Sequence, residues 1–206
     1  MPARRSLLSM IQSTTALLLA GCAPMMSAPP ATPFSADHTR EVGLSGNVQH
    51  QLFTSPGRQH TAGNGTVWIR KQSSTFKGTE SGLLISAGMM SFASGGTYVR
   101  NQIKGLPEGT YVGTQVEAGW LWAGASLPVA VRLSDAIWFT TQPGVRYAMF
   151  GALHIPAGLS IELGEHYRLD TEGGVNAMGW LPNQTDNPMF HTRIHAYGSL
   201  GLSKHW

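Results

Sequence analysis

The sequence predicts an all-β fold, namely an up-and-down antiparallel β-barrel of about 8–10 strands. From residue 41 onward apolar residues recur at every second position, which is the period of a strand and not of a helix. A hairpin pattern near residue 127 returns about 30 residues later, and repeated hairpins build barrels of this kind. Glycine is abundant, at 25 residues, whereas charged residues make up only 12%, about half of the roughly 25% in soluble domains.

Residues 1–21 have the composition of an export signal. Arg4 and Arg5 form a positive start, and a short apolar stretch over residues 7–19 follows, interrupted by four polar residues at 12–15. This stretch is too short and too polar for a transmembrane helix, so we expect a cleaved signal peptide.

The signal ends in Leu19-Ala20-Gly21-Cys22, which resembles the lipobox of bacterial lipoproteins. The resemblance implies cleavage before Cys22, acylation of its thiol and of the new amino terminus, and so a stable membrane anchor. Ala23 resembles the residue that permits passage to the outer membrane. The alternative is an ordinary secretory signal with a chance cysteine; with only one cysteine, no internal disulfide can form.

Residues 22–40 are expected to be a flexible tether after the lipidated cysteine. Four prolines alternate with Ala, Met and Ser, and no period is visible. Such composition favours an extended, semi-flexible chain. The barrel domain is therefore predicted over residues 41–206.

The first half of the barrel domain shows shorter alternating runs. Residues 42–48 alternate, and 66–71, 83–93 and 110–122 are further candidate strands. Four glycine-rich stretches are expected to be the loops between them, because glycine often marks turns; they are residues 63–65, 78–82, 95–96 and 105–109.

The second half is more regular. Residues 137–149, 153–163, 167–176 and 192–202 alternate strictly, with one apolar face and one small or polar face. Short turns at Ser134-Asp135 and at residues 164–166 predict two hairpins.

The alternation is compatible with two barrels of opposite orientation of the apolar face. In a membrane barrel the apolar face contacts lipid and the polar face lines the interior, whereas in a soluble, lipocalin-like barrel the apolar face is the core. Small polar faces, few charges, and aromatic residues placed near the strand ends like interfacial girdles favour the membrane barrel; these aromatics are Trp68, Trp120, Trp122, Trp138, Tyr167, Trp180 and Trp206. The C-terminal region, with Gly201 and Trp206, resembles small outer-membrane β-barrel proteins in part, although Lys204 departs from their pattern.

Charged residues on the polar faces are expected to form ion pairs inside an embedded barrel, because unpaired ions there are costly. The predicted interior ion-pair network comprises Arg132, Arg146, Glu162, Arg168, Asp170, Glu172 and Arg193.

Catalytic and metal-binding patterns are weak. His191 and His195 are four positions apart on one strand, about 13 Å, which is too far to share one ion. His195, Ser199, Glu172 and Asp170 supply the residue types of a lipid-modifying hydrolase, but the local sequence does not match the deacylase pattern. We therefore expect no cofactor, no metal and no enzymatic activity.

These observations predict a lipid-anchored outer-membrane barrel of a Gram-negative bacterium with a structural or interaction role. Its expected partners are membrane lipid, through acylated Cys22, and an unidentified envelope protein. A lipid-tethered soluble barrel that binds an apolar ligand and a lipid-modifying hydrolase are the alternatives. The formal charge falls from +3 to about +1 without Arg4 and Arg5, and the remaining basic residues are scattered, so nucleic-acid binding is not expected.

Overall fold

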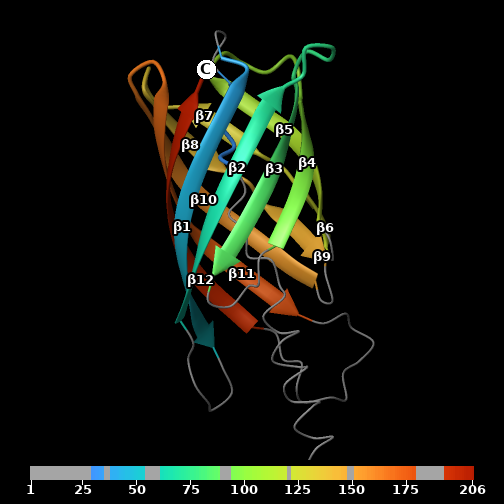
Figure 1. The fold of residues 1–206 in the computed structure, drawn as a ribbon, viewed down its shortest axis with the longest axis vertical. Helices are drawn as coiled ribbons and strands as arrows, with labels where there is room; N and C mark the ends of the chain where they lie inside the picture. The colour runs from blue at the N-terminus through green and yellow to red at the C-terminus, as the bar shows by residue number, and fades with distance from the viewer. Residues whose placement is uncertain are drawn as a thin grey trace, which may run out of the picture.

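The computed structural model describes residues 29–34, 38–53, 61–88, 94–119, 122–147, 151–179 and 193–206. Cys22 lies outside these residues. Within them the regular structure consists of strands (Figure 1), and none of the described residues forms a helix long and apolar enough to span a membrane.

Twelve strand segments follow one another along the chain. They are β1 (Arg40–Phe53), β2 (Thr61–Gln72), β3 (Thr79–Gly88), β4 (Ser94–Gln102), β5 (Thr110–Gly119), β6 (Ala123–Ser126), β7 (Val129–Arg132), β8 (Ile137–Thr141), β9 (Gly144–Tyr147), β10 (Gly151–Leu163), β11 (Tyr167–Gly179) and β12 (Arg193–His205).

Ten strands result from these twelve segments, because two strands are each interrupted once. β6 and β7 both pair with β5, and β8 and β9 both pair with β10. The interruptions contain Pro128 and Pro143, which have no N–H to donate to the ladder. The breaks adjoin each other across the sheet, where the Leu127 amide donates to the Pro143 carbonyl at 2.9 Å.

The sheet closes into a barrel. Each strand pairs antiparallel with its neighbours in the chain, and β1 pairs with β12 in register from Glu41 opposite His205 to Gln51 opposite His195, after which the register shifts by one residue. The predicted all-β, up-and-down barrel is therefore confirmed, at the upper end of the predicted strand number.

The two ends of the barrel differ. At one end, which we call the terminal mouth, the chain ends at Trp206, and turns 73–78, 103–109, 133–136 and 164–166 join the strands (Figure 1). Glycines with positive φ, such as Gly78 and Gly164, shape three of these turns. At the other end, the far mouth, β11 ends at Gly179 and β12 begins at Arg193, the longest separation in sequence between two consecutive strands.

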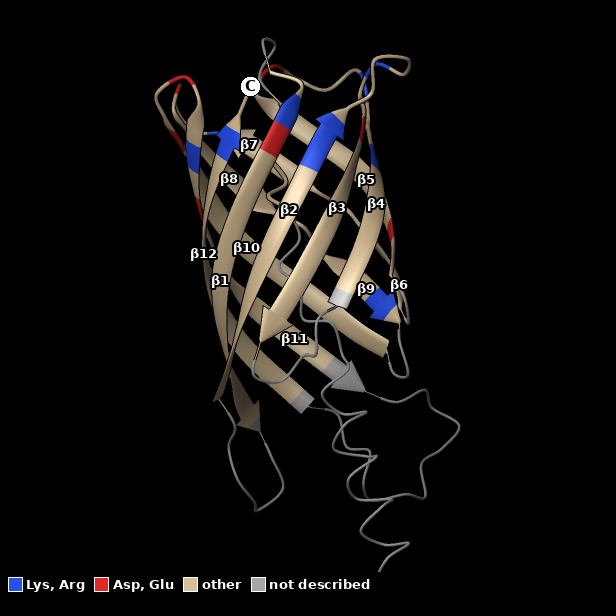
Figure 2. Ribbon diagram, in the orientation of Figure 1, with Lys and Arg blue, Asp and Glu red and all other residues tan. Residues whose placement is uncertain are grey.

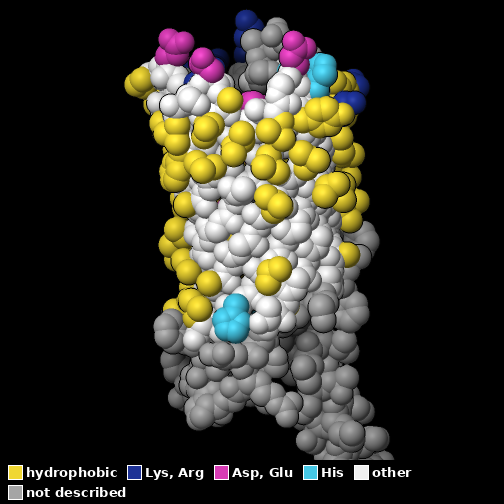
Figure 3. All heavy atoms as spheres, turned by 90° about the vertical axis from the view of Figure 1, so that its left-hand side faces the viewer, with side chains coloured by type: hydrophobic (Ala, Val, Ile, Leu, Met, Phe, Trp, Pro, Cys, Tyr) yellow, Lys and Arg dark blue, Asp and Glu magenta, His cyan; other side chains and the backbone are white. Residues whose placement is uncertain are grey.

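The exterior of the barrel is apolar. Apolar side chains alternate outward along every long strand, and on the face seen in Figure 3 they gather most densely near the terminal mouth. The more exposed of them include Leu44, Val48, Val67, Ile69, Ile85, Val116, Val145, Leu153, Ile155 and Leu200.

The exposed charged side chains that the structure describes lie at one end of the barrel. Among strand residues whose side chains are described, the exposed charged ones are Arg40, Lys71, Arg132 and Lys204, each at a strand terminus. All four belong to the terminal mouth, where charged residues gather in Figure 2. The rest of the described outer wall carries no exposed charged side chain.

Several predicted loops are wrong, because glycines that suggested turns lie within strands. Residues 63–65 belong to β2, residues 79–82 to β3, and residues 95–96 to β4. At Gly82 the glycine makes room for a ring, because an added Cβ would lie 2.3 Å from the Tyr98 ring. The loop predicted at residues 105–109 is confirmed.

Two aromatic residues expected at the membrane interface are instead inside. Trp68 and Trp122 are almost completely buried and form an interior cluster with Leu84 and Tyr98. Both tryptophans lie at inward positions beside glycines, which explains how such large rings fit into a narrow barrel. Tyr167 and Trp206 are exposed at the terminal mouth, and Trp138 is half-buried.

The replacement Gly43→Ala should destabilise the barrel by about 1–3 kcal/mol through overpacking. The added Cβ would lie 2.2 Å from the Trp68 indole and 2.9 Å from the Ser203 Cβ. Gly46→Ala, on the same strand but with nothing within 4 Å, is the matched control and should change stability by less than about 0.5 kcal/mol. Urea unfolding monitored by tryptophan fluorescence measures both, and equal effects would contradict this packing.

Candidate functional site

The interior of the barrel is polar, and its side chains form many hydrogen bonds and ion pairs. Inward positions carry Glu, Arg, Gln, Asn, Ser and Thr side chains, most of them buried. Because buried charges are costly unless paired, their arrangement is the feature most specific to this chain.

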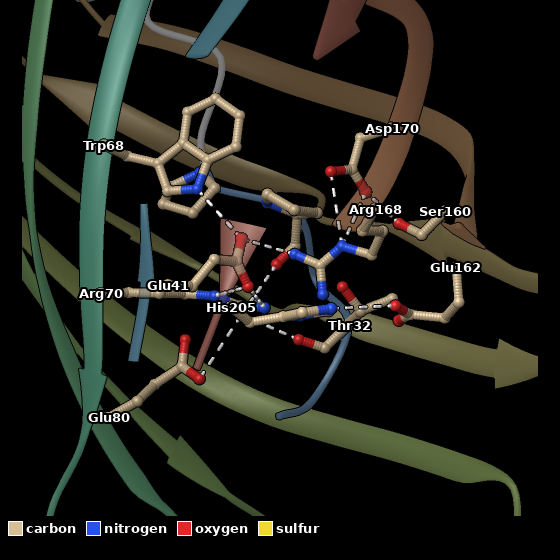
Figure 4. A network of polar contacts seen from close by, with 12 residues as sticks. Thr32, Glu41, Trp68, Arg70, Glu80, Ser160, Glu162, Arg168, Asp170 and His205 are labelled. Atoms are coloured by element: carbon tan, nitrogen blue, oxygen red, sulfur yellow. Dashed lines mark hydrogen bonds and ion pairs between the residues drawn. The ribbon is translucent and has the colours of Figure 1, made fainter. Parts of the chain in front are cut away.

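Glu41 on β1 is the centre of this arrangement (Figure 4). Its Oε2 accepts from Arg70 Nε at 2.8 Å and Nη2 at 2.5 Å, and its Oε1 accepts from Arg168 Nη2 at 2.6 Å. The Trp68 indole N–H also donates to Oε1, at 3.2 Å. One wholly buried carboxylate therefore contacts two buried arginines and one indole.

The pairing continues across β3 and β4. Arg70 Nη1 lies 3.6 Å from Glu80 Oε2, and Arg100 Nη1 lies 2.8 Å from Glu80 Oε1. Arg70 and Arg100 are both completely buried. Glu80 thus links two guanidinium groups on the strands that flank β3.

From Arg100 the contacts run on toward the far mouth. Arg100 Nε donates to Gln115 Oε1 at 2.9 Å, and Gln115 Nε2 donates to Glu117 Oε2 at 3.3 Å. Glu117 Oε1 accepts from Arg146 Nε at 2.5 Å. We call this set the interior network; in order it comprises Asp170, Arg168, Glu41, Arg70, Glu80, Arg100, Gln115, Glu117 and Arg146, from β11, β1, β2, β3, β4, β5 and β9.

The other end of the interior network lies on β11, where side chains from β10 and β12 surround it. Arg168 Nε is 3.2 Å from Asp170 Oδ1, and the Ser160 hydroxyl donates to the same carboxylate. Near the terminal mouth, His205 Nε2 lies 3.4 Å from Glu162 Oε2. These contacts connect β10, β11 and β12, and Arg168 joins them to Glu41 on β1 (Figure 4).

The residues predicted to pair inside are placed as follows. Arg146, Arg168 and Asp170 belong to the interior network, and Glu162 and Glu172 are inward with other partners. Arg132 differs from the expectation: it lies at the rim, 3.4 Å from the exposed Asp135, because β7 ends there. Arg193 is on β12, but its side chain is outside the described part.

Sequence reasoning missed Glu41, Arg70, Glu80, Arg100 and Glu117. Each occupies an inward position between two outward residues, as Arg70 does between Ile69 and Lys71. A single charge at the polar position of an otherwise apolar-alternating strand was the available signal. The loops predicted at 78–82 and 95–96 obscured it for β3 and β4.

The N-terminal segment, residues 29–34, lies inside the barrel. Arg70 Nη1 donates to the Thr32 carbonyl at 2.8 Å, and Arg100 donates to the carbonyls of Pro30 at 3.1 Å and Pro29 at 3.2 Å. The Arg70 guanidinium also lies 4.4 Å from the centre of the Phe34 ring.

This segment enters through the terminal mouth. The His38 ring stacks on His205 at 4.8 Å, and the Thr39 amide donates to the Trp206 carbonyl at 3.2 Å. Going back toward residue 29, the contacts move from Arg70 to Arg100, and the thin blue trace runs within the cylinder (Figure 1).

Residues 29–34 therefore do not behave as the free tether expected over residues 22–40. Residues 29–32 are buried, with Ala31 2% and Thr32 0% exposed. The physical reason is that proline has no N–H, so an extended Pro-rich chain offers more carbonyl acceptors than N–H donors. Two buried arginines supply the donors.

The hydrolase residue types are not assembled into a catalytic arrangement. His195 and Ser199 lie four positions apart on β12, about 13 Å along the strand. Glu172 accepts from the Tyr197 hydroxyl at 2.8 Å, and Asp170 pairs with Arg168. His191 is outside the described residues, and no group of three or more His, Cys, Asp or Glu side chains within the described part could hold a metal.

No protein-family model and no curated protein sequence matches this chain. Among solved structures, the translocator domain of the autotransporter NalP from Neisseria meningitidis is similar at a TM-score of 0.46 and 11% identity, covering 98% of each chain. Neisserial surface protein A (NspA) gives 0.42 and 10%, covering 81% of this chain and 97% of NspA. The N-terminal β-barrel domain of Pseudomonas aeruginosa OprF gives 0.35 and 11%, covering 82% and 100%. Similarity at this level says nothing about function.

Proposed function

We propose that this chain is a lipoprotein whose β-barrel spans the outer membrane of a Gram-negative bacterium and has a structural or interaction role there. The observation that carries the proposal is the distribution of side chains on the outer wall. Apolar residues alternate outward along it, and the exposed charges of the described strand residues lie at strand ends at the terminal mouth. A wall of this kind suits hydrocarbon, in which exposed charges are destabilising.

The strand lengths support a transmembrane span. β10, β11 and β12 have 13 residues each. At about 3.3 Å per residue and a tilt of about 40°, such strands rise about 33 Å. This exceeds the roughly 25 Å apolar band of outer-membrane barrels.

The interior argues against a tethered barrel that binds an apolar ligand. A lipocalin-like barrel needs an apolar cavity, whereas here the interior network and residues 29–34 occupy the centre. The polar groups of this interior are largely bonded to one another. This arrangement favours a closed, structural barrel.

The terminal mouth is proposed to face the periplasm and the far mouth the exterior. Outer-membrane barrels have short periplasmic turns and longer extracellular loops. The turns at the terminal mouth are short, and the longest separation in sequence between consecutive strands, from Gly179 to Arg193, is at the far mouth.

Lipidation at Cys22 is tested by Cys22→Ala. We expect loss of metabolically incorporated palmitate and accumulation of the uncleaved precursor, because Cys22 is the only cysteine and the expected acyl acceptor. Cys22→Ser gives a conservative second variant with the same expected outcome. Palmitate incorporation at the wild-type level in either variant would contradict the lipobox assignment.

A further inference from the structure

We propose that the barrel interior contains a binding site for an extended, proline-rich peptide, that residues 29–34 occupy this site as a displaceable plug, and that an aqueous pore opens when they leave. The inference rests on the proposed membrane-spanning function for its pore and only on the described contacts for its peptide site.

The first argument is the match between donors and acceptors. Arg70 and Arg100 are completely buried, and between them they donate to the carbonyls of three residues of the segment. These guanidinium groups are themselves fixed by Glu41, Glu80 and Gln115. The donors are therefore held in place by the barrel, as expected for a preorganised site.

The second argument is the chemistry of the ligand. Three of the six residues are prolines, whose restricted backbone loses little entropy on binding in an extended form. The recognition uses backbone carbonyls and the Phe34 ring over Arg70. It therefore selects an extended Pro-rich chain followed by an aromatic residue.

The third argument is the position of the segment. The interior network runs across seven strand segments, from β11 through β1 to β9, and residues 29–32 are buried against it. A barrel of ten strands lies between the eight-stranded type, which side chains fill, and the wide porins. The segment occupies part of the intermediate lumen, so its departure leaves a water-accessible path.

The test uses the full chain with residues 29–34 replaced by alternating Gly and Ser, which keeps the length. In planar bilayers the wild-type protein should give no stepwise current, and the variant should give discrete steps. A synthetic peptide Pro-Pro-Ala-Thr-Pro-Phe should block these steps. The peptide Gly-Gly-Ala-Thr-Gly-Phe keeps the carbonyls and the ring but should bind at least about tenfold more weakly, because its chain is more flexible.

Two single substitutions provide milder forms of the test. Ala31→Trp leaves every barrel residue unchanged but cannot fit at a position that is 2% exposed, so it should expel the segment and open the pore. Thr32→Ala is the matched control: Arg70 binds the Thr32 backbone carbonyl, so this variant should stay closed. Heat-modifiable migration on gels verifies that each barrel is folded.

If the Gly/Ser variant and the Ala31→Trp variant are both folded but give no current in planar bilayers, residues 29–34 are not a plug. If the Gly/Ser variant gives current steps that the proline peptide does not block, the proposed peptide site is wrong. Fluorescence anisotropy of the labelled proline peptide with the Gly/Ser variant in detergent reports binding without a bilayer. If the protein binds the peptide in this assay but does not float with lipid vesicles, the proposed membrane function fails while the peptide site stands.

Discussion

Replacing Glu41 by Ala should cost about 3–5 kcal/mol of folding free energy, because it leaves buried charges without their partner. Arg70 and Arg168 both lose their contacts to this carboxylate, and the Trp68 indole loses its acceptor. Glu80 and Asp170 remain near the two arginines but cannot replace bonds of 2.5 and 2.6 Å. Urea unfolding of the barrel in detergent or vesicles measures the loss.

The matched control removes an exposed ion pair. Asp135→Ala breaks the contact between Arg132 and Asp135, which are 42% and 103% exposed at their side chains. Exposed pairs contribute about 0–1 kcal/mol, so this variant should be close to wild type. A Glu41→Ala barrel as stable as the Asp135→Ala barrel would refute the role of the interior network.

Leu159→Arg should cost about 2–4 kcal/mol if the outer wall contacts hydrocarbon. Leu159 is on β10, faces outward and lies near the middle of the strand. Leu159→Ala should cost less, because fluid acyl chains fill the space that the smaller side chain leaves. The two variants are compared by unfolding in lipid vesicles.

Leu84 provides the inward counterpart of Leu159. It is completely buried in the cluster with Trp68, Tyr98 and Trp122. Leu84→Ala should cost about 2–5 kcal/mol through the cavity that it creates. If Leu159→Ala proves as costly as Leu84→Ala, the outer wall packs against protein and not against lipid.

The alternation of the long strands could be predicted from the sequence because the period of a strand is local. Leu153, Ile155 and Leu159 face outward while His154 and Ser160 face inward, as strict alternation requires. Local periodicity could not decide whether the apolar face meets lipid or a core. That decision depends on closure of the sheet, which places every apolar face outward.

In the first half of the barrel domain, glycines within strands led to wrong predictions of loops. Gly96 suggested a turn, but it lies in β4, where an added Cβ would be 2.5 Å from the Trp122 ring. The reason for this glycine is a ring that comes from a residue 26 positions away. Single-sequence reasoning has no means of detecting such a long-range partner.

The interior network and the bound N-terminal segment were also beyond sequence reasoning. Glu41 and Arg168 are 127 positions apart, and Arg100 and Pro30 are 70 positions apart. Charges can be assigned to polar faces one strand at a time. Their pairing depends on which strands become neighbours and at what depth each side chain projects.

The most direct test of the membrane-spanning barrel is a nitroxide scan of β10 in lipid vesicles. With Cys22 replaced, no other cysteine remains, so single cysteines at Leu153, His154, Ile155, Leu159 and Ser160 can be labelled cleanly. Labels at the three outward positions should be accessible to oxygen dissolved in the bilayer, and those at His154 and Ser160 should be protected from it. Outward labels that instead respond to a water-soluble relaxation agent, with no period of two for oxygen, would contradict the proposed membrane span.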